Sequence, residues 1–338
     1  MKLKEIKEFL KGKDDSALFS EGERIREEVF GKEIYLRGIV EFSNVCREKC
    51  LYCGLRCYNR ELERYRLSYE EILDAVKLVK KSKLGTVVLQ SGNDPYYTAE
   101  IVEKIIKEIK RRYGNSLAIT LSLGERTPDE LKRWKEAGAD RYLLKVETFD
   151  EKLYERMRPG RKLKERLMLI EILMKLGYEV GSGLIIDLPG MNDDILASDV
   201  LELSLLGLHM IASGPFIPHN RTPLYEYPKG DVKKSLRVIA LLRILNKFSN
   251  IPSTSAMASV EEDARIKGLV VGANVIMPSV TPLRVRKLYN IYPGKNESDS
   301  STLEDVNKIK NLISSAGFIP SEAVGEFKGG NHDKSSER

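Results

Sequence analysis

Apolar, β-branched runs alternate with amphipathic stretches of ten to fifteen residues along most of the chain. This alternation is typical of strand–helix units that build a parallel sheet. Eight apolar runs predict strands at Ile34–Phe42, Thr86–Ser91, Ala118–Leu123, Arg141–Glu147, Val180–Ile186, Met210–Pro215, Pro252–Ser255 and Asn274–Met277. The amphipathic stretches predict helices near Tyr69–Lys83, Thr98–Tyr113, Pro128–Ala137, Leu163–Leu176, Asp193–Leu206, Lys233–Asn246 and Val260–Val270.

Eight strand–helix units predict an α/β fold, a closed (β/α)₈ barrel of the TIM type. A six-stranded open barrel with extra strands at its end is the first alternative, and a doubly wound sheet is the second. No Gly-rich phosphate loop follows the first predicted strand, which disfavours the doubly wound sheet.

The predicted barrel spans residues 34–296 and has a helical segment on each side. Residues 1–33 predict two short amphipathic helices that meet around Gly12 and Asp14, and we expect them to plug the bottom of the barrel. Residues 297–327 form a C-terminal extension with one helix at Thr302–Ser315. The tail at 328–338 has no apolar pattern, which predicts disorder.

Composition narrows the class of protein. The chain has 338 residues, of which 42% are apolar and 31% charged, as in an ordinary well-cored protein. Its net charge of +6 is small and no basic run is interleaved with aromatics, so nucleic-acid binding is not supported. No window predicts a membrane span, and residues 1–30 do not resemble a signal peptide. Four cysteines, three of them clustered, indicate a reducing cytoplasm rather than a disulfide framework.

The clustered cysteines are Cys46, Cys50 and Cys53. Three thiolates on one loop can hold three irons of a [4Fe–4S] cluster and leave the fourth iron open to a small molecule. A cluster that does chemistry needs such an open position. Zinc is the alternative, but zinc sites of this kind draw on a second Cys or His pair. The chain offers only Cys57, His209, His219 and His332 for that purpose.

Polar and glycine-rich segments follow the predicted strands, where a parallel barrel carries its catalytic groups. The cysteine loop follows the first strand. The segments after later strands are Gln90–Pro95, Leu121–Glu125, Lys145–Thr148, Gly214–His219, Thr254–Met257 and Met277–Pro282.

The cysteine spacing, with Tyr52 just before the last cysteine, resembles the radical S-adenosylmethionine (SAM) superfamily. From about Tyr35 to Lys295 the chain is similar to its biotin-synthase-like branch. That branch contains the [FeFe]-hydrogenase maturase HydE, methylornithine synthase (PylB) and the [Fe]-hydrogenase cofactor protein HmdB. The stretches closest to HydE are Leu36–Gly38, Glu41–Asn44, Leu51–Arg56, Arg64–Arg66, Leu89–Gly92, Thr120–Glu125, Trp134–Tyr142, Gly214–His219, Ala273–Pro278 and Tyr292–Lys295.

The resemblance implies a role for each of several residues. Cys46, Cys50 and Cys53 would bind the [4Fe–4S] cluster. Ser91, Gly92 and Asn93 stand where the family usually has Gly-Gly-Glu, which receives the SAM amino group. Tyr52 would pack on adenine, Glu147 would bind the ribose hydroxyls, and Arg166 would pair with the SAM carboxylate. Ser122 completes the implied SAM site.

The chain departs from HydE at two places. Cys57 stands where HydE has a basic residue and methylornithine synthases have a cysteine. Lys145-Val146-Glu147-Thr148 differs from the Arg-His-Glu-Thr of HydE and is closer to the synthase. No cysteine follows Cys57, so the second clusters of biotin synthase and of some HydE proteins are absent.

We therefore expect a cytoplasmic radical SAM enzyme that acts on a small enclosed substrate, amino-acid-like or organometallic. Lys145, Thr254, Ser255 and Tyr289 would hold the substrate's anionic groups. HydE-type hydrogenase maturation is the first interpretation, with HmdB-like cofactor assembly and lysine rearrangement as alternatives. The electron donor would be a reductant such as ferredoxin or flavodoxin. A non-catalytic iron–sulfur or zinc scaffold is the alternative of another class.

Overall fold

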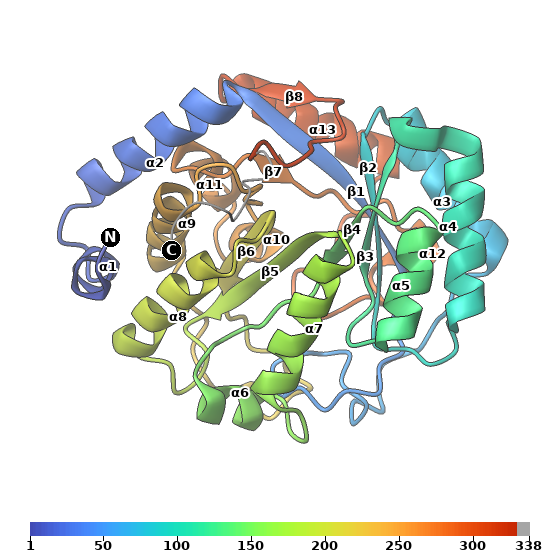
Figure 1. Cartoon of the computed structure of the whole chain (residues 1–338), viewed down its shortest axis with the longest axis horizontal. Coiled ribbons are helices and arrows are strands. Elements are labelled where there is room, and N and C mark those ends of the chain that lie inside the picture. The colour runs from blue at the N-terminus through green and yellow to red at the C-terminus, as the bar shows by residue number, and fades with distance from the viewer. Residues whose placement is uncertain (330–338) are drawn as a thin grey trace.

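A ring of parallel strands forms the centre of the molecule. The computed structural model describes residues 1–329, and part of the tail predicted to be disordered lies outside them. The strands of the ring are β1 (Glu33–Ser43), β2 (Thr86–Ser91), β3 (Ala118–Ser122), β4 (Arg141–Leu143), β5 (Glu179–Ile186), β6 (Met210–Pro215) and β7 (Val275–Ile276). They pair in the order β6-β5-β4-β3-β2-β1-β7 (Figure 1).

Residues 250–253 close the ring between β6 and β7. Parallel bridges join Met210 to Asn250 and Ser213 to Ser253 on one side, and Pro252 to Val275 on the other. The structure thus confirms the predicted barrel. The segment makes isolated bridges rather than the predicted strand because Pro252 lacks an N–H for the ladder, and the next helix begins at Ser255.

Helices surround the ring and follow the strands in turn. They are α3 (Tyr69–Lys81), α4 (Ala99–Tyr113), α5 (Pro128–Glu136), α7 (Leu163–Lys175), α8 (Asp193–Leu205), α9 (Val232–Leu245), α10 (Ser255–Val260) and α11 (Ala264–Val270). Two capping boxes show why they begin where they do: the hydroxyls of Ser68 and Thr127 accept hydrogen bonds from the backbone N–H groups of Glu71 and Glu130. The short elements are α6 (Glu151–Met157), α12 (Leu283–Arg286) and the 3₁₀ turn at Gly114–Ser116.

The N-terminal helices α1 (Leu3–Leu10) and α2 (Asp15–Phe30) lie outside the barrel, where α1 contacts α8 and α9 and α2 runs along α9 (Figure 1). The expectation that they plug the bottom is wrong. The C-terminal segment does so instead, with β8 (Ile319–Ser321) paired to β1. Beyond it, the Gly325 carbonyl accepts hydrogen bonds from Arg37, Arg141 and Asn250 at 3.0, 3.2 and 3.2 Å. The Gly325 carbonyl thus provides a hydrogen-bond acceptor for two buried guanidinium groups, Arg37 on β1 and Arg141 on β4.

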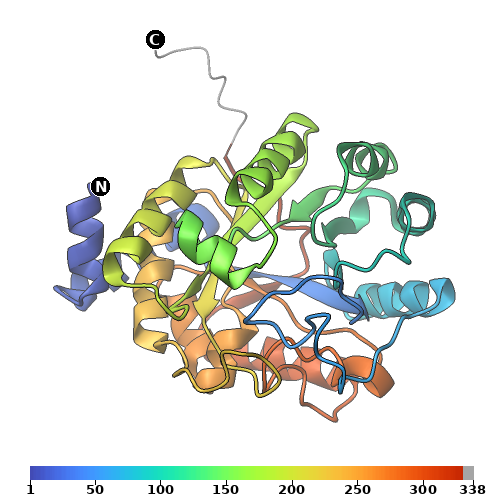
Figure 2. The same ribbon diagram turned by 90° about the horizontal axis from the view of Figure 1, so that it is seen from below.

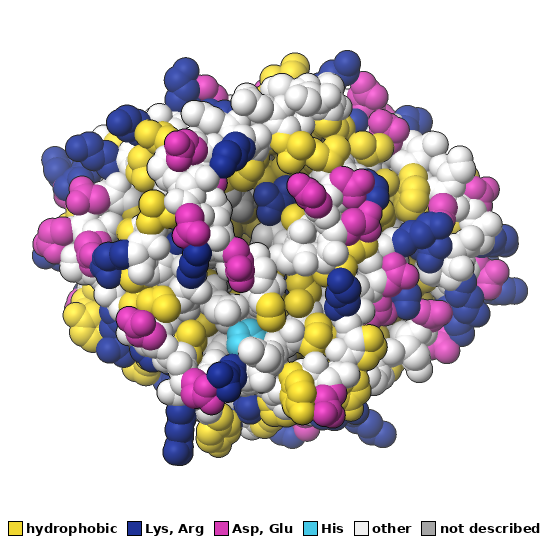
Figure 3. All heavy atoms as spheres, turned by 180° about the vertical axis from the view of Figure 1, so that it is seen from behind, with side chains coloured by type: hydrophobic (Ala, Val, Ile, Leu, Met, Phe, Trp, Pro, Cys, Tyr) yellow, Lys and Arg dark blue, Asp and Glu magenta, His cyan; other side chains and the backbone are white. Residues whose placement is uncertain are grey.

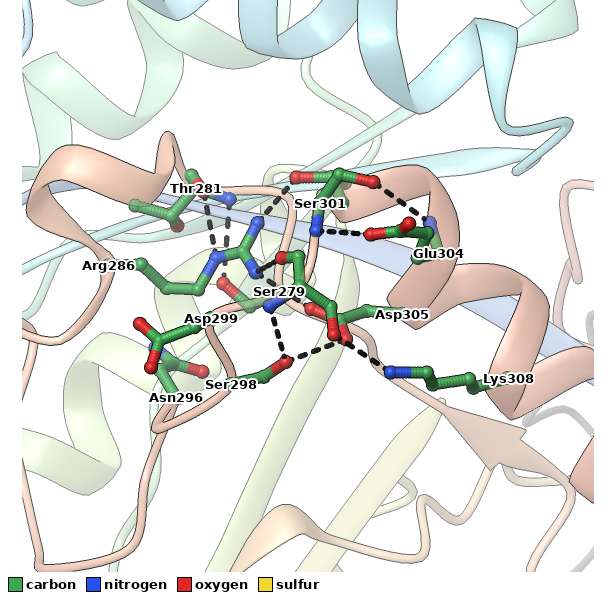
Figure 4. Close-up of polar contacts among 12 residues, drawn as sticks. Ser279, Thr281, Arg286, Asn296, Ser298, Asp299, Ser301, Glu304, Asp305 and Lys308 are labelled. Carbon is green, nitrogen blue, oxygen red and sulfur yellow. Dashed lines mark hydrogen bonds and ion pairs between the residues drawn. The ribbon is translucent and has the colours of Figure 1, made fainter.

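The C-terminal helix α13 (Thr302–Ser315), at the predicted position, is fastened to the loop after β7 by Arg286 (Figure 4). The buried guanidinium donates to Asp305 Oδ2 at 2.8 Å, to the Thr281 carbonyl at 3.0 Å and to the Ser300 carbonyl at 3.2 Å. Burial of this charge is tolerated because its donors meet a carboxylate and several oxygens.

Two predicted elements differ from the structure by four residues at one end. The fourth strand ends at Leu143 instead of Glu147, because Val146 N–H donates to the Ser182 hydroxyl and Glu147 adopts a positive φ of 71°. The helix predicted at Val260–Val270 begins only at Ala264, after α10 has ended.

Candidate active site

One cavity of about 340 Å³ opens at the carboxyl ends of the strands. β6 contributes only the small residues Ala212, Gly214 and Pro215 to its lining, which leaves room in the cavity. The residues that the sequence singles out as site candidates all line this cavity: Cys46, Cys50, Tyr52, Cys53, Ser91, Gly92, Asn93, Ser122, Lys145, Glu147, Arg166, Thr254, Ser255 and Tyr289.

Backbone hydrogen bonds hold the cysteine loop over the cavity. Leu51 N–H donates to the Met157 carbonyl at 2.9 Å, and Arg47 N–H donates to the Asn93 carbonyl at 3.1 Å. Arg64 adds four donor contacts to the carbonyls of Asn44, Leu55, Arg56 and Asn59. The loop is therefore rigid without regular secondary structure, and its three cysteines face inward.

Gly92 is required by the packing of this loop. A Cβ at this position would lie 2.2 Å from the Val45 carbonyl oxygen and 2.7 Å from Cys46 Cβ. Gly92 N–H also donates to the Ser43 carbonyl at 3.0 Å. The end of β2 and Gly92 thus support the cysteine loop, and any larger residue at position 92 would push the loop away.

The three cysteine thiols of the loop are largely shielded from water. Burial raises the pKa of Cys46 to about 11 and also raises the pKa values of Cys50 and Cys53. Without a cation beside them the thiols are protonated, so a bound metal must supply the charge that makes them thiolates. Within residues 1–329, no three His, Cys, Asp or Glu side chains converge on one ion position. Three cysteines on one loop that lines the cavity are a ligand set that fits a [4Fe–4S] cluster with one open iron.

An ion-pair network lies beside the cysteines. Arg166 Nη2 lies 2.9 Å from Glu125 Oε1, and Arg161 Nη1 lies 3.1 Å from Glu125 Oε2. Arg158 is 3.6 Å from both Glu48 and Glu125. Three guanidinium groups thus share two carboxylates, which leaves one positive charge for an anionic ligand at the cavity wall.

Asn93 belongs to the same network through its side-chain amide. Its Nδ2 donates to Glu48 Oε1 at 2.7 Å, while its buried Oδ1 has no protein partner among the described residues. A buried oxygen without a donor is costly unless a ligand fills the gap. Neighbouring Ser91 donates its hydroxyl to the Gly92 carbonyl at 2.7 Å.

Glu147 and Lys145 form an ion pair on the opposite wall. Lys145 Nζ lies 3.3 Å from Glu147 Oε2, and the Tyr52 hydroxyl lies 3.5 Å from Glu147 Oε1. Glu147 holds its positive φ between two ladder bonds, from its own N–H to the Gly183 carbonyl and from Ile185 N–H to its carbonyl. A non-glycine residue held in this conformation is strained, and such strain clusters at functional sites.

Hydroxyl groups gather at the far end of the cavity. The Ser255 and Tyr292 hydroxyls are 2.6 Å apart, and Gln90 Nε2 donates to the Tyr289 hydroxyl at 3.1 Å. Thr254 Oγ1 is 3.4 Å from the Ser213 carbonyl. This end of the cavity can therefore hold a small polar molecule through several hydroxyls.

Several cavity residues were not predicted from the sequence. Glu48, Glu125, Arg158 and Lys295 line the cavity, and Lys295 Nζ lies 2.9 Å from the buried Glu41 carboxylate. On the chain they look like ordinary surface charges. The Tyr292–Lys295 stretch was a usable signal for Lys295, because it already stood among the family-like segments. Cys57 is half-buried and does not line the cavity.

Comparison with known proteins decides the family. A sequence profile described as "Radical SAM superfamily" matches residues 40–201. The [FeFe] hydrogenase maturase subunit HydE of Thermotoga maritima is 45% identical over 302 residues, which cover 88% of this chain and 86% of that protein. The chain belongs to the radical SAM superfamily. It is accordingly a radical SAM enzyme, and the superfamily implies a [4Fe–4S] cluster and SAM.

Other radical SAM proteins are also similar to the chain. The 3-methylornithine synthase of Methanosarcina acetivorans is 31% identical over 79% of this chain and 76% of that protein. The crystal structure of methylornithine synthase (PylB) has a TM-score of 0.81 at 23% identity, over 95% of this chain and 94% of that one. The [FeFe]-hydrogenase maturase HydG from Carboxydothermus hydrogenoformans has a TM-score of 0.79 at 22% identity, over 95% and 76%. These two structures support the barrel fold.

The lengths of the helices and the charge distribution on the surface bear on membrane and nucleic-acid binding. None of the helices within the described residues is long and apolar enough to cross a membrane. On the face shown in Figure 3, basic and acidic side chains are interspersed around a central hollow. That face therefore carries no stripe of a single charge.

Proposed function

We propose that this enzyme matures a hydrogenase active site in the manner of HydE. The observation that carries the proposal is the 45% identity to HydE, which extends over 88% of this chain and 86% of that protein. The enclosed cavity supports it, since every site residue expected from the sequence faces one space of small-molecule size.

In this proposal Cys46, Cys50 and Cys53 hold a [4Fe–4S] cluster. SAM, when bound at the cluster, supplies a 5′-deoxyadenosyl radical that removes a hydrogen atom from the substrate. Arg166, which pairs with Glu125, would also bind the SAM carboxylate. Asn93 and the Ser91–Gly92 backbone would bind the SAM amino group. Glu147 would bind the ribose, Tyr52 would lie against adenine, and Ser122 would complete this wall. The unpartnered Oδ1 of Asn93 supports this placement.

The substrate would occupy the opposite end of the cavity. Lys145, Thr254, Ser255 and Tyr289 would hold its anionic groups, and Lys295, whose charge is balanced by Glu41, would add a further N–H donor. A small amino-acid-like or organometallic molecule fits this combination of hydroxyls and ammonium groups. The apolar side chains of Ile39, Leu143 and Met277 would keep water away from it, as radical chemistry requires. A ferredoxin or flavodoxin would supply the electron.

Lysine rearrangement, as in methylornithine synthase, is the second candidate function. Two observations favour it: Lys145 replaces the arginine that HydE has in this segment, and Cys57 is shared with the synthase. Because a lysine ammonium cannot hold an anion through two parallel bonds, the substrate wall differs from that of HydE.

Two assays test these functions. Anaerobically reconstituted protein should bind about four irons per chain and release 5′-deoxyadenosine from SAM on reduction, whereas the Cys50→Ala variant should do neither. A host that lacks HydE should then regain [FeFe]-hydrogenase activity when it expresses this chain but not the variant. Conversion of lysine to 3-methylornithine, without rescue of the hydrogenase, would decide for the second candidate.

A further inference from the structure

The outer side of the cysteine loop carries positive charge that the rest of the chain leaves unpaired. Lys49 and Arg60 are exposed, Arg56 is partly exposed, and none of the three forms an ion pair within the described residues. Other clustered surface cations do have a carboxylate partner, as Arg24 has in Glu21 and Arg133 in Glu103. The basic surface of this loop is therefore available to something outside the chain.

Of the acidic residues near this surface, Glu48 and Glu61 each pair with a cation elsewhere, whereas Glu63 is exposed. Glu48 points inward, where Arg161 Nε donates to its Oε2 at 2.8 Å. Glu61 is exposed but faces Arg221, whose Nη1 lies 2.8 Å from Glu61 Oε1. The fold thus turns the negative charge of Glu48 toward the cavity and leaves the positive charges outside.

An aromatic residue lies among the exposed cations. Tyr58 is 58% exposed, and the Lys49 ammonium and Arg56 guanidinium lie 5.9 and 5.3 Å from the centre of its ring. These cation–π contacts fix the position of the exposed Tyr58 ring. Exposed Tyr and Arg are the residues that protein–protein interfaces favour.

This basic surface lies directly over the cysteines. Lys49 immediately precedes Cys50, and Cys57 N–H donates to the Glu48 carbonyl at 2.9 Å, which folds residues 56–58 back over the start of the loop. The same loop therefore presents its cysteines to the cavity and its cations to the solvent. A protein bound on the outside would be separated from the cluster by one layer of chain.

We propose that Lys49, Arg56, Tyr58 and Arg60 form the docking surface for an acidic one-electron donor protein of the ferredoxin or flavodoxin class. The inference rests on the proposed function, since it needs a cluster that must be reduced. Charge complementarity decides the kind of partner, because an acidic protein is steered toward such a surface. A small contact suits electron transfer, in which complexes are weak and dissociate after each encounter.

The test compares two reductants on the cluster-loaded protein. The variant Lys49→Glu/Arg60→Glu removes two exposed cations that make no protein ion pair, and Lys4→Glu/Lys11→Glu on α1 is the matched control. Figure 2 shows α1 at the edge of the molecule, away from the cysteine loop. Cluster reduction is followed by its loss of absorbance, first with photoreduced deazaflavin, an uncharged small molecule, and then with reduced flavodoxin.

With flavodoxin at about 10 mM salt, where the Debye length is about 30 Å, the loop variant should be reduced roughly ten- to a hundredfold more slowly than wild type and control. The difference should vanish near 1 M salt, and deazaflavin should reduce all three proteins equally. Calorimetry with oxidised flavodoxin should show that the loop variant also binds flavodoxin more weakly. The variant Tyr58→Ala should weaken binding by an amount that is the same at low and at high salt.

Equal reduction of the loop variant and wild type by flavodoxin at low salt would overturn the docking surface. Wild-type protein that takes up no cluster, or that releases no 5′-deoxyadenosine after deazaflavin reduction, would instead overturn the proposed function. The two failures are thereby distinguished.

Discussion

Arg161 donates from its Nε to Glu48 Oε2 over 2.8 Å, and this contact fastens the middle of the cysteine loop to the turn between α6 and α7. Glu48 is placed between Cys46 and Cys50 in the sequence, yet its carboxylate is buried and also accepts from Asn93 Nδ2. One side chain therefore joins the first, second and fourth strand-end loops. The position of the cysteines depends on an ion pair that holds no cluster itself.

Replacing Glu48 by Ala should loosen this junction. Truncating one partner of a buried pair typically costs about 3–5 kcal/mol, because the other charge is left unpaired. We expect a lower unfolding midpoint and fewer bound irons per chain after reconstitution, measured by calorimetry and iron analysis. Glu165→Ala on the outer part of α7 is the matched control and should change neither. Full iron loading of Glu48→Ala would show that the loop needs no such support.

Gly92→Ala should displace the cysteine loop while the barrel stays folded. The added methyl group meets the Val45 carbonyl at 2.2 Å, and overpacking of this kind costs about 1–3 kcal/mol. We expect a clear loss of iron binding with an unchanged far-ultraviolet circular dichroism spectrum. Gly207→Ala serves as the control: its φ of 66° makes alanine cost about 1–2 kcal/mol, but no atom lies within 4 Å of the new methyl group. It should therefore bind iron normally.

Glu147→Gly and Glu147→Gln separate backbone strain from carboxylate chemistry. Glycine accepts the φ of 71° without strain, so Glu147→Gly should keep or slightly raise stability, by up to about 1 kcal/mol. Glutamine keeps the strain and loses the charge. If Glu147 binds the SAM ribose, both variants should bind SAM at least tenfold more weakly, or about 1.4 kcal/mol, as measured by calorimetry. Wild-type affinity in both would remove Glu147 from the SAM site.

Asp199 on α8 should make stability fall as pH rises. Its side chain is buried, and Phe149 N–H donates to its Oδ1 at 2.8 Å. Burial outweighs the hydrogen bonds from Thr148 and Phe149 and raises its pKa from 3.8 to about 6. Between these two values the folded state binds more protons than the unfolded state, so the free energy of unfolding decreases with increasing pH. The loss is complete above pH 6 and amounts to roughly 3 kcal/mol.

The variant Asp199→Asn isolates this contribution. It should be more stable than wild type at pH 7 and lose that advantage toward pH 4, as measured by denaturant unfolding at several pH values. The exposed Asp74→Asn is the control and should follow wild type throughout. A stability difference between Asp199→Asn and wild type that does not change with pH would show that the carboxylate ionises normally.

The strand bounds of the barrel follow from the sequence wherever a run is apolar on both faces. Thr86–Ser91 and Met210–Pro215 agree with the structure to the residue, because parallel strands between layers of helices are buried on both sides. Arg141–Glu147 was predicted too long. Its last residues, 144–147, alternate between apolar and charged as a strand does, and only a three-dimensional contact, Val146 N–H to the Ser182 hydroxyl, interrupts the ladder.

The sequence located the cavity but not its ion pairs. The predicted residues lie at strand ends, and a parallel barrel brings strand ends together whatever their identity. Glu48, Glu125 and Arg158 come from three different loops, and each has the appearance of a solvated charge in its own segment. Their convergence depends on loop geometry that no periodicity encodes. The predicted position of the N-terminal helices was wrong for a similar reason: an amphipathic pattern shows that one face of a helix is buried, but not which surface it packs against.

The pairing of β8 with β1 has a consequence for the order of synthesis. Glu33 lies beside Ile319, so the lower end of β1, which β2 does not pair, acquires this partner only after the intervening residues 34–318 have been made. Until then the nascent chain exposes the lower edge of its oldest strand, together with Arg37 and its unsatisfied donors. Such an edge can pair with other chains, and the synthesis of β8 ends this vulnerable period.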